Sequence, residues 1–151
     1  MYQLTSIILT SMRVVIDTCV WVAAMRSRDG ASFALLSEIH HQRFKFGISV
    51  SLFLEYKTQL LKKGLLNKAH IDQILAAIAY YGVEVPIYYR LRPNLVDEND
   101  NLVFECAVHF GASAIITHNV KDFINPGLKG YNIDILRPRD FLLKIKEGNQ
   151  Q

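Results

Sequence analysis

The sequence predicts an α/β fold: a three-layer α/β/α sandwich with a central parallel sheet of four to five strands. Three observations predict it. Short apolar, β-branched runs such as residues 14–16 are typical of buried strands. Amphipathic segments lie between these runs, and Ile71, Ile74, Leu75 and Ile78 recur at helical spacing. Strands and helices alternate along the chain, which is the order of a parallel sheet covered by helices on both faces.

Each element is predicted from its local pattern. The strands are short apolar runs between polar or glycine-containing segments, and they cover residues 12–17, 44–50, 83–87, 114–117 and 133–136. The helices cover residues 18–25, 31–41, 51–63, 67–81 and 99–110, with a single helical turn over 120–124. Gly64, Gly82 and Gly111 mark helix ends. Pro138 is expected at the first position of a last helix, where its missing N–H is not needed.

Composition indicates one ordinary globular domain. Of the 151 residues half are hydrophobic and 21% are charged, which excludes a disordered chain. The net charge of +3 permits a polyanionic partner without requiring one. We expect a domain over residues 12–146 and a polar tail over 147–151. Residues 1–11 form an N-terminal extension, and Met12 is an alternative native start.

The remaining bulk features predict a cytoplasmic location. No apolar run is long enough to span a bilayer, so no membrane association is expected. Cys19 and Cys106 lie far apart and have no metal-ligand spacing, which favours reduced cysteines in the core.

Polar side chains follow several of the predicted strands or open the next helix. They are Asp17, Glu55, Asp97, Asp100, Asn119 and Asp122. Because the carboxyl ends of parallel strands share one edge of a sheet, these side chains are expected to meet in one cleft. Carboxylates gathered in one cleft repel each other unless a cation lies between them. The first hypothesis is therefore a divalent metal site for phosphate chemistry.

Asp100 carries the sharpest local signal. It lies on a helical face with Val103, Phe104 and Ala107, so its carboxylate is aimed along the core-facing stripe. A first-turn acid stabilised by the helix dipole is the alternative. A metal ligand is favoured because no basic residue lies nearby on that face. Asp17 is equally well read as a helix N-cap, and both roles are compatible.

The other candidates are weaker by themselves. Glu55 lies on a polar helix face, where a solvated side chain is the ordinary interpretation. Asn119 and Asp122 resemble a helix cap with an acidic third residue. An amide oxygen at Asn119 would bring no charge, which Asp122 could supply directly or through water. His118 stands at a strand end near the cleft, although a single histidine is weak evidence.

Basic residues that could contact phosphates flank the same edge, although ordinary solvated surface is the alternative for each. They are Arg26, Arg28, Lys62, Lys63, Arg90 and Arg92.

Four motifs, in order, resemble those of PIN domains over roughly residues 12–142. They lie at residues 14–21 (Val-Val-Ile-Asp-Thr-Cys-Val-Trp), 54–56, 97–101 and 116–123. Residues 28–32 and the Leu35-Leu36 pair also resemble a VapC-like bacterial branch, described as toxin components of toxin–antitoxin pairs.

The resemblance implies a ribonuclease that depends on Mg²⁺ or Mn²⁺ and cleaves RNA phosphodiesters with a metal-activated water. It assigns Asp17, Glu55 and Asp100 as the catalytic, metal-binding acids. The fourth family acid falls at Asn119, a departure for which Asp122 is expected to compensate in metal binding. Supporting roles are expected for Thr18, Cys19, Asp97 and Thr117, where Cys19 replaces the more usual Asn or Ser.

The toxin resemblance also implies a cognate antitoxin that blocks the cleft, and a homodimer. Two other interpretations remain open at this point. The same fold, weakened by Asn119, could work as a catalytically weak or inactive module that binds RNA or a protein. A nucleotide-binding or signalling domain is the second, and the lack of a glycine-rich phosphate loop after the first strand disfavours it.

Overall fold

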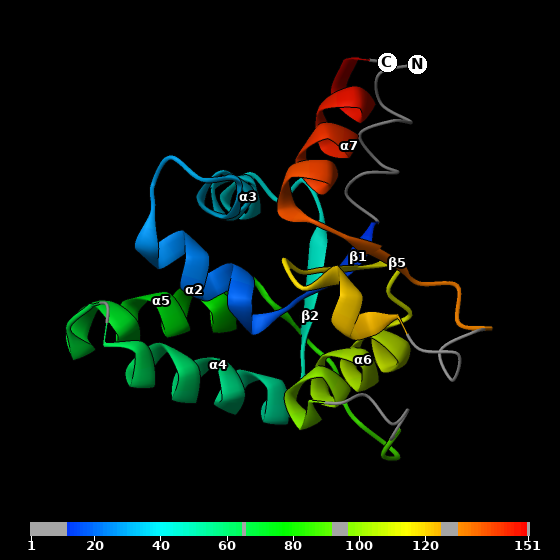
Figure 1. Cartoon of the computed structure of the whole chain (residues 1–151), viewed down its shortest axis with the longest axis horizontal. Helices are drawn as coiled ribbons and strands as arrows, with labels where there is room; N and C mark the ends of the chain where they lie inside the picture. The colour runs from blue at the N-terminus through cyan, green and yellow to red at the C-terminus, as the bar shows by residue number, and fades with distance from the viewer. Residues whose placement is uncertain (1–11, 65, 92–96, 125–129, 151) are drawn as a thin grey trace.

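The computed structural model of the chain describes residues 12–64, 66–91, 97–124 and 130–150 (Figure 1). The predicted extension over 1–11, the loops expected at 92–94 and 125–127, and Arg92 lie outside the described residues.

A five-stranded parallel sheet forms the centre of the molecule, as the sequence predicted. Its strands are β1 (Arg13–Ile16), β2 (Lys45–Ile48), β3 (Val83–Glu84), β4 (Ala114–Ile116) and β5 (Asp134–Leu136). Their order across the sheet is β3-β2-β1-β4-β5, and every neighbouring pair is parallel. The central strand β1 is completely buried toward its end, where Val14, Val15 and Ile16 have no exposed surface. Asp17 therefore follows directly from three fully buried strand residues.

Helices flank this sheet and complete the predicted three-layer α/β/α sandwich (Figure 1). They are α2 (Thr18–Arg26), α3 (Ala31–His40), α4 (Val50–Lys63), α5 (Lys68–Tyr81), α6 (Glu98–Phe110) and α7 (Pro138–Gln150), with the 3₁₀ turn η1 (Val120–Phe123). Helix α6 packs against β1, β2 and β4, and α2 packs against α3 and α4. Helix α7 begins at Pro138 as predicted and continues to Gln150, through most of the expected tail.

Several predicted boundaries differ from the structure, and three of the differences have a clear local reason. Strand β2 ends at Ile48, because the Ser49 side chain caps α4 by accepting the Leu52 N–H at 3.1 Å. Strand β3 stops at Glu84, two residues before Pro86, which has no N–H for a sheet ladder. Helix α6 begins at Glu98 rather than Asn99, and its cap is Asp97.

The core ties the helices to the end of β1. Tyr56 of α4 is fully buried, and its hydroxyl donates a hydrogen bond to the Ile16 carbonyl. The Trp21 ring of α2 packs against the rings of Tyr56 and Phe46, with centroids 5.6 and 5.9 Å away. These contacts fix α2 and α4 around the residue that follows Ile16. No helix among the described residues is long and apolar enough to cross a membrane.

Candidate functional site

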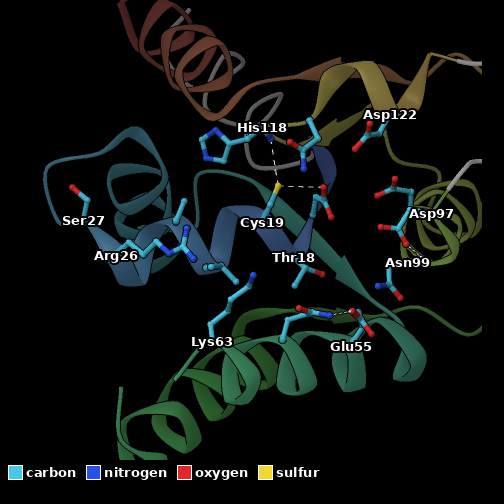
Figure 2. A pocket seen from close by; sticks show the side chains of 16 residues that line it. Thr18, Cys19, Arg26, Ser27, Glu55, Lys63, Asp97, Asn99, His118 and Asp122 are labelled. Atoms are coloured by element: carbon cyan, nitrogen blue, oxygen red, sulfur yellow. Dashed lines mark hydrogen bonds between the residues drawn. The ribbon is translucent and has the colours of Figure 1, made fainter. Parts of the chain in front are cut away.

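A pocket of about 680 Å³ opens at the carboxyl edge of the sheet (Figure 2). Its walls come from one face of α2 along its whole length, from one face of α4, from the beginning of α6, and from the turn after β4. Most of the predicted site residues line it, namely Asp17, Thr18, Cys19, Arg26, Glu55, Asp97, Asp100, Asn119 and Asp122. Arg28 and Arg90 are exposed and are not among its lining residues.

Hydrogen bonds from Thr117, which follows β4, and from Cys19 of α2 hold the Asp17 side chain in place. Asp17 stands at the N-cap position of α2, yet its side chain makes no cap hydrogen bond. Instead its Oδ2 accepts a hydrogen bond of 2.7 Å from the Thr117 hydroxyl and one of 3.2 Å from the Cys19 thiol. Only 6% of Asp17 is exposed. Burial raises the pKa of Asp17, these hydrogen bonds lower it in part, and the charge of Asp122 raises it further.

Thr117 joins the first and fourth strands at the site. Its fully buried hydroxyl gives its only proton to Asp17 and accepts the Asn119 N–H at 3.0 Å. One side chain thus orients the carboxylate of Asp17 and the turn that carries Asn119. Burial, followed by the charge of Asp17, raises the pKa of Cys19 to about 12, so this residue stays a thiol and remains a donor.

Asp100 faces Asp17 across the pocket from the first turn of α6. Only 7% of it is exposed. Burial raises its pKa to about 7, and the charges of Asp17, Asp97 and Asp122 contribute in the same direction. Asp97 caps α6 by accepting the Asn99 N–H at 2.9 Å, which sets the start of the helix that carries Asp100. The structure therefore brings several carboxylates from three distant segments within electrostatic reach of each other.

Glu55 reaches the pocket from α4 and is half-buried. Gln59, one helical turn further on, donates a hydrogen bond of 2.9 Å to its Oε1. This amide holds one carboxylate oxygen of Glu55, and none of the described cations forms an ion pair with that carboxylate.

The donors of this pocket fit a hard divalent cation in their chemistry. Carboxylate and amide oxygens are the ligands that Mg²⁺ and Mn²⁺ take, and Mg²⁺ commonly uses only one or two carboxylates beside water and phosphate. Among the described residues, the ion pairs are Arg43–Glu38 and Lys144–Asp134, so no cation neutralises Asp17 or Asp100. The described side chains nevertheless contain no ready group of three or more His, Cys, Asp or Glu that could hold a metal ion.

Several lining residues were given no site role, or only a weak one, by the sequence. They are Val22, Ala23, Ser27, Gln59, Lys63, Asn99 and His118. His118 lies beside the buried Ser32 of α3, with 2.6 Å between its Nε2 and the serine hydroxyl. Burial lowers the pKa of His118, and the charge of Asp17 opposes that shift. Spacing of four residues from Glu55 is the signal that could have identified Gln59 and Lys63, whereas no local signal pairs Ser32 with His118.

Glu105 and His109, which the sequence gave no catalytic role, line no part of the pocket. Glu105 is buried, and its Oε2 accepts the Leu91 N–H at 2.9 Å. Its function in the structure is to hold the segment that follows β3 against α6.

Comparison with known proteins identifies a family match. A family model described as "PIN domain" matches residues 13–121, which include β1, the first four strand-to-helix junctions and the start of η1. No curated protein matches the chain.

Proposed function

The chain belongs to the PIN domain family, whose members are generally nucleases, and on that premise we propose that it is a metal-dependent endoribonuclease. The substrate class would be RNA, and the cofactor Mg²⁺ or Mn²⁺. Divalent metals and nucleic-acid substrates are typical of the family. The choice of RNA and the dependence of this chain on either metal are our proposals.

One observation carries the proposal. Asp17 and Asp100, 83 positions apart in the sequence, are buried in one pocket. Burial raises the pKa of both; the charge of Asp17 adds to the shift of Asp100, and the charge of Asp122 adds to both. Burying uncompensated carboxylates together costs free energy, which a bound cation would offset. Neither carboxylate has an ion-pair partner among the described residues, so no described cation supplies this compensation.

The chain's own residues divide the work in this proposal. Asp17 and Asp100 would hold the cation, with Glu55 beside them on α4. When bound, a divalent ion makes water a better nucleophile at neutral pH and neutralises charge on a phosphoryl oxygen. Thr117 and Cys19 orient Asp17 by donating to its Oδ2. Asp97 fixes the first turn of α6, and Gln59 fixes Glu55.

Asn119 sets the number of ions that the pocket would hold. It contributes an amide oxygen and no charge, so a second cation would depend on the carboxylate of Asp122. Asp122 is exposed and contributes to the raised pKa of both Asp17 and Asp100. We therefore expect one tightly held ion, and a second that binds only with substrate phosphate.

Cleavage of mixed RNA in the presence of Mn²⁺ tests the proposal. Wild type should cut, and Asp100→Asn should lose at least the ~10–100-fold in rate that removal of an outer metal-supporting group costs, because it removes a ligand itself. Asp72→Asn, an exposed acid on α5 away from the pocket, is the matched control and should cut at the wild-type rate. Purified Asp100→Asn protein that cuts as fast as wild type would refute the assignment.

The toxin role is a finer part of the proposal. It is supported by residues 28–32 and by Leu35 and Leu36, which resemble toxin components of toxin–antitoxin pairs. A cognate antitoxin that covers the pocket, a homodimer and a cytoplasmic location follow from that role. Growth arrest on expression of wild type, absent for Asp100→Asn, would support it.

A binding module is the second candidate, and Asn119 is the observation that favours it. If the pocket lacks the charge to hold metal with substrate, RNA would bind without being cut. Retained RNA affinity of wild type with no cleavage in Mn²⁺ or Mg²⁺ would replace the nuclease proposal with this one.

A further inference from the structure

We propose that the pocket contains a second anion subsite, formed by Arg26 and Lys63, that binds an RNA phosphate other than the one being cleaved. The proposal rests on the proposed function, because it takes the acidic end of the pocket as the place of cleavage. It adds a substrate requirement: a strand with at least one phosphate beyond the scissile one.

The subsite follows from the way two helices run along the pocket. Helices α2 and α4 pack side by side, and each turns one face toward the pocket. On α4 that face is Glu55, Gln59 and Lys63, spaced four residues apart. On α2 it includes Thr18, Val22 and Arg26, with the same spacing. Each helix thus has an acid near its beginning, Asp17 or Glu55, and a cation at its end.

The two ends of the pocket are electrostatically separate. Eight helical residues rise by about 12 Å, which exceeds the Debye length of about 8 Å at physiological ionic strength. Figure 2 shows Arg26 and Lys63 on one side of the pocket and Asp97 and Asp122 on the opposite side. The charges that contribute to the raised pKa of Asp100 all come from other acids. The basic end therefore does not neutralise the acidic end.

Both cations are available to a ligand. Each side chain is exposed, and neither takes part in an ion pair with any acid in the described part of the chain. The favourable interaction of cations with helix C-termini explains why basic residues stand in these last turns. It does not explain why they face the pocket, since Lys62 satisfies the same helix end from outside the lining.

A linear polyanion matches this arrangement, and a single phosphate does not. One phosphate cannot contact both ends of the pocket when about 12 Å of helix separates them. Val22, which is buried, and Ala23, which is partly exposed, line the pocket between the two ends and add no charge there. An RNA strand with one phosphate at the acids and another at Arg26 and Lys63 satisfies both ends.

Binding of two synthetic RNAs tests the subsite. The full chain is titrated with fluorescent hexauridylate in buffer that contains Ca²⁺. UpU, which has one phosphate, is then added as a competitor for binding to the protein. A gel checks that the RNA stays intact. In Arg26→Gln/Lys63→Gln, affinity for hexauridylate should fall about tenfold, as expected for lost bonds to a charged group. The slope of log K against log[salt] should become less steep by about 0.7, the value for one phosphate of a single strand. Affinity for UpU should stay within twofold.

The control variant removes the same charge elsewhere. Lys57→Gln/Lys146→Gln changes two exposed lysines that do not line the pocket, and it should bind both RNAs like wild type. An equal loss of hexauridylate affinity in both double variants would show that only the net charge of the protein matters, and it would overturn the subsite. So would an unchanged affinity in the Arg26 and Lys63 variant, or an equal loss for UpU.

A modified RNA tests the subsite without any protein variant. In this hexauridylate every linkage except one central phosphate is a neutral methylphosphonate. Wild type should bind it less tightly than unmodified hexauridylate.

The measurements also distinguish failure of the subsite from failure of the nuclease proposal. If the preference for hexauridylate depends on Arg26 and Lys63 but no Mn²⁺-dependent cleavage is found, the subsite stands and the nuclease proposal fails. If wild type cleaves RNA and the double variant binds normally, only the subsite fails.

Discussion

Asp17 and Asp100 are charged residues at buried positions, which lowers the stability of the fold. Asp17 directly follows the buried central strand, and Asp100 lies on the core-facing side of α6 among buried residues. Neither carboxylate has a described cationic partner, so its charge is destabilising without a ligand. The hydrogen bonds to Asp17 offset only part of this cost, since its pKa stays raised.

This conflict predicts an unusual dependence of stability on pH. The folded pKa of Asp100 is about 7, above the usual 3.8, so between these values the metal-free folded state holds a proton that the unfolded state has lost. The stabilisation is complete below about pH 4 and disappears as the pH rises through 7. Metal-free Asp100→Asn should therefore melt above wild type at pH 7.5, by at least ~3 °C for about 1 kcal/mol in a chain of this length.

Thermal unfolding in EDTA at pH 5 and pH 7.5 measures this difference. The gap between Asp100→Asn and wild type should widen as the pH rises, while Asp72→Asn, on the exposed face of α5, should show no such gap. A gap that is the same at both pH values would mean that the charge of Asp100 costs nothing in the folded protein.

At the scale of elements, packing of α6 on the sheet determines where Asp100 lies. Phe110, at the end of α6, packs over Gly47 of β2 so closely that a Cβ there would lie 2.6 Å from its ring. A Cβ would also lie 2.8 Å from Val85. Gly47 is required for this contact because of the missing side chain and not because of its backbone angles.

Gly47→Ala should therefore lower the free energy of unfolding by about 1–3 kcal/mol, as overpacking of a core does. Urea unfolding measures it. Gly30→Ala is the control, because a Cβ there meets nothing closer than 3.8 Å, and its effect should be below about 1 kcal/mol. Equal effects of the two substitutions would show that α6 does not press on β2 as described.

The sequence predicted elements well where one local pattern decides them. Val14 to Ile16 predicted the central strand, and the strand-to-helix order predicted that Asp17 and Asp100 would share an edge. It failed at the start of α6, where Asp97 and Asn99 are both good caps and only the folded backbone selects Asp97.

Contacts between distant segments could not be predicted in the same way. Thr117 reaches Asp17 only because β4 pairs with β1, a choice of neighbour that no local pattern contains. The hydrogen bond between Ser32 and His118 likewise joins α3 to the turn after β4.

At the scale of the whole molecule, charge is distributed unevenly. The chain carries a net charge of +3, although acids from three segments gather in one pocket. The chain outside the pocket therefore has an excess of positive charge, which attracts a polyanion, while the acidic end of the pocket repels one. A divalent cation bound at the acidic end, as proposed, would offset this repulsion.

Metal-linked stability tests that claim most directly. Thermal unfolding at pH 7.5 is measured with and without Mn²⁺ for wild type and Asp100→Asn. At one hundred times the dissociation constant, Mn²⁺ should stabilise wild type by about 2.7 kcal/mol, or about 5–10 °C in Tm for a chain of this size, and should leave Asp100→Asn nearly unchanged. A wild-type Tm that ignores Mn²⁺, or an equal rise in both proteins, would contradict the account.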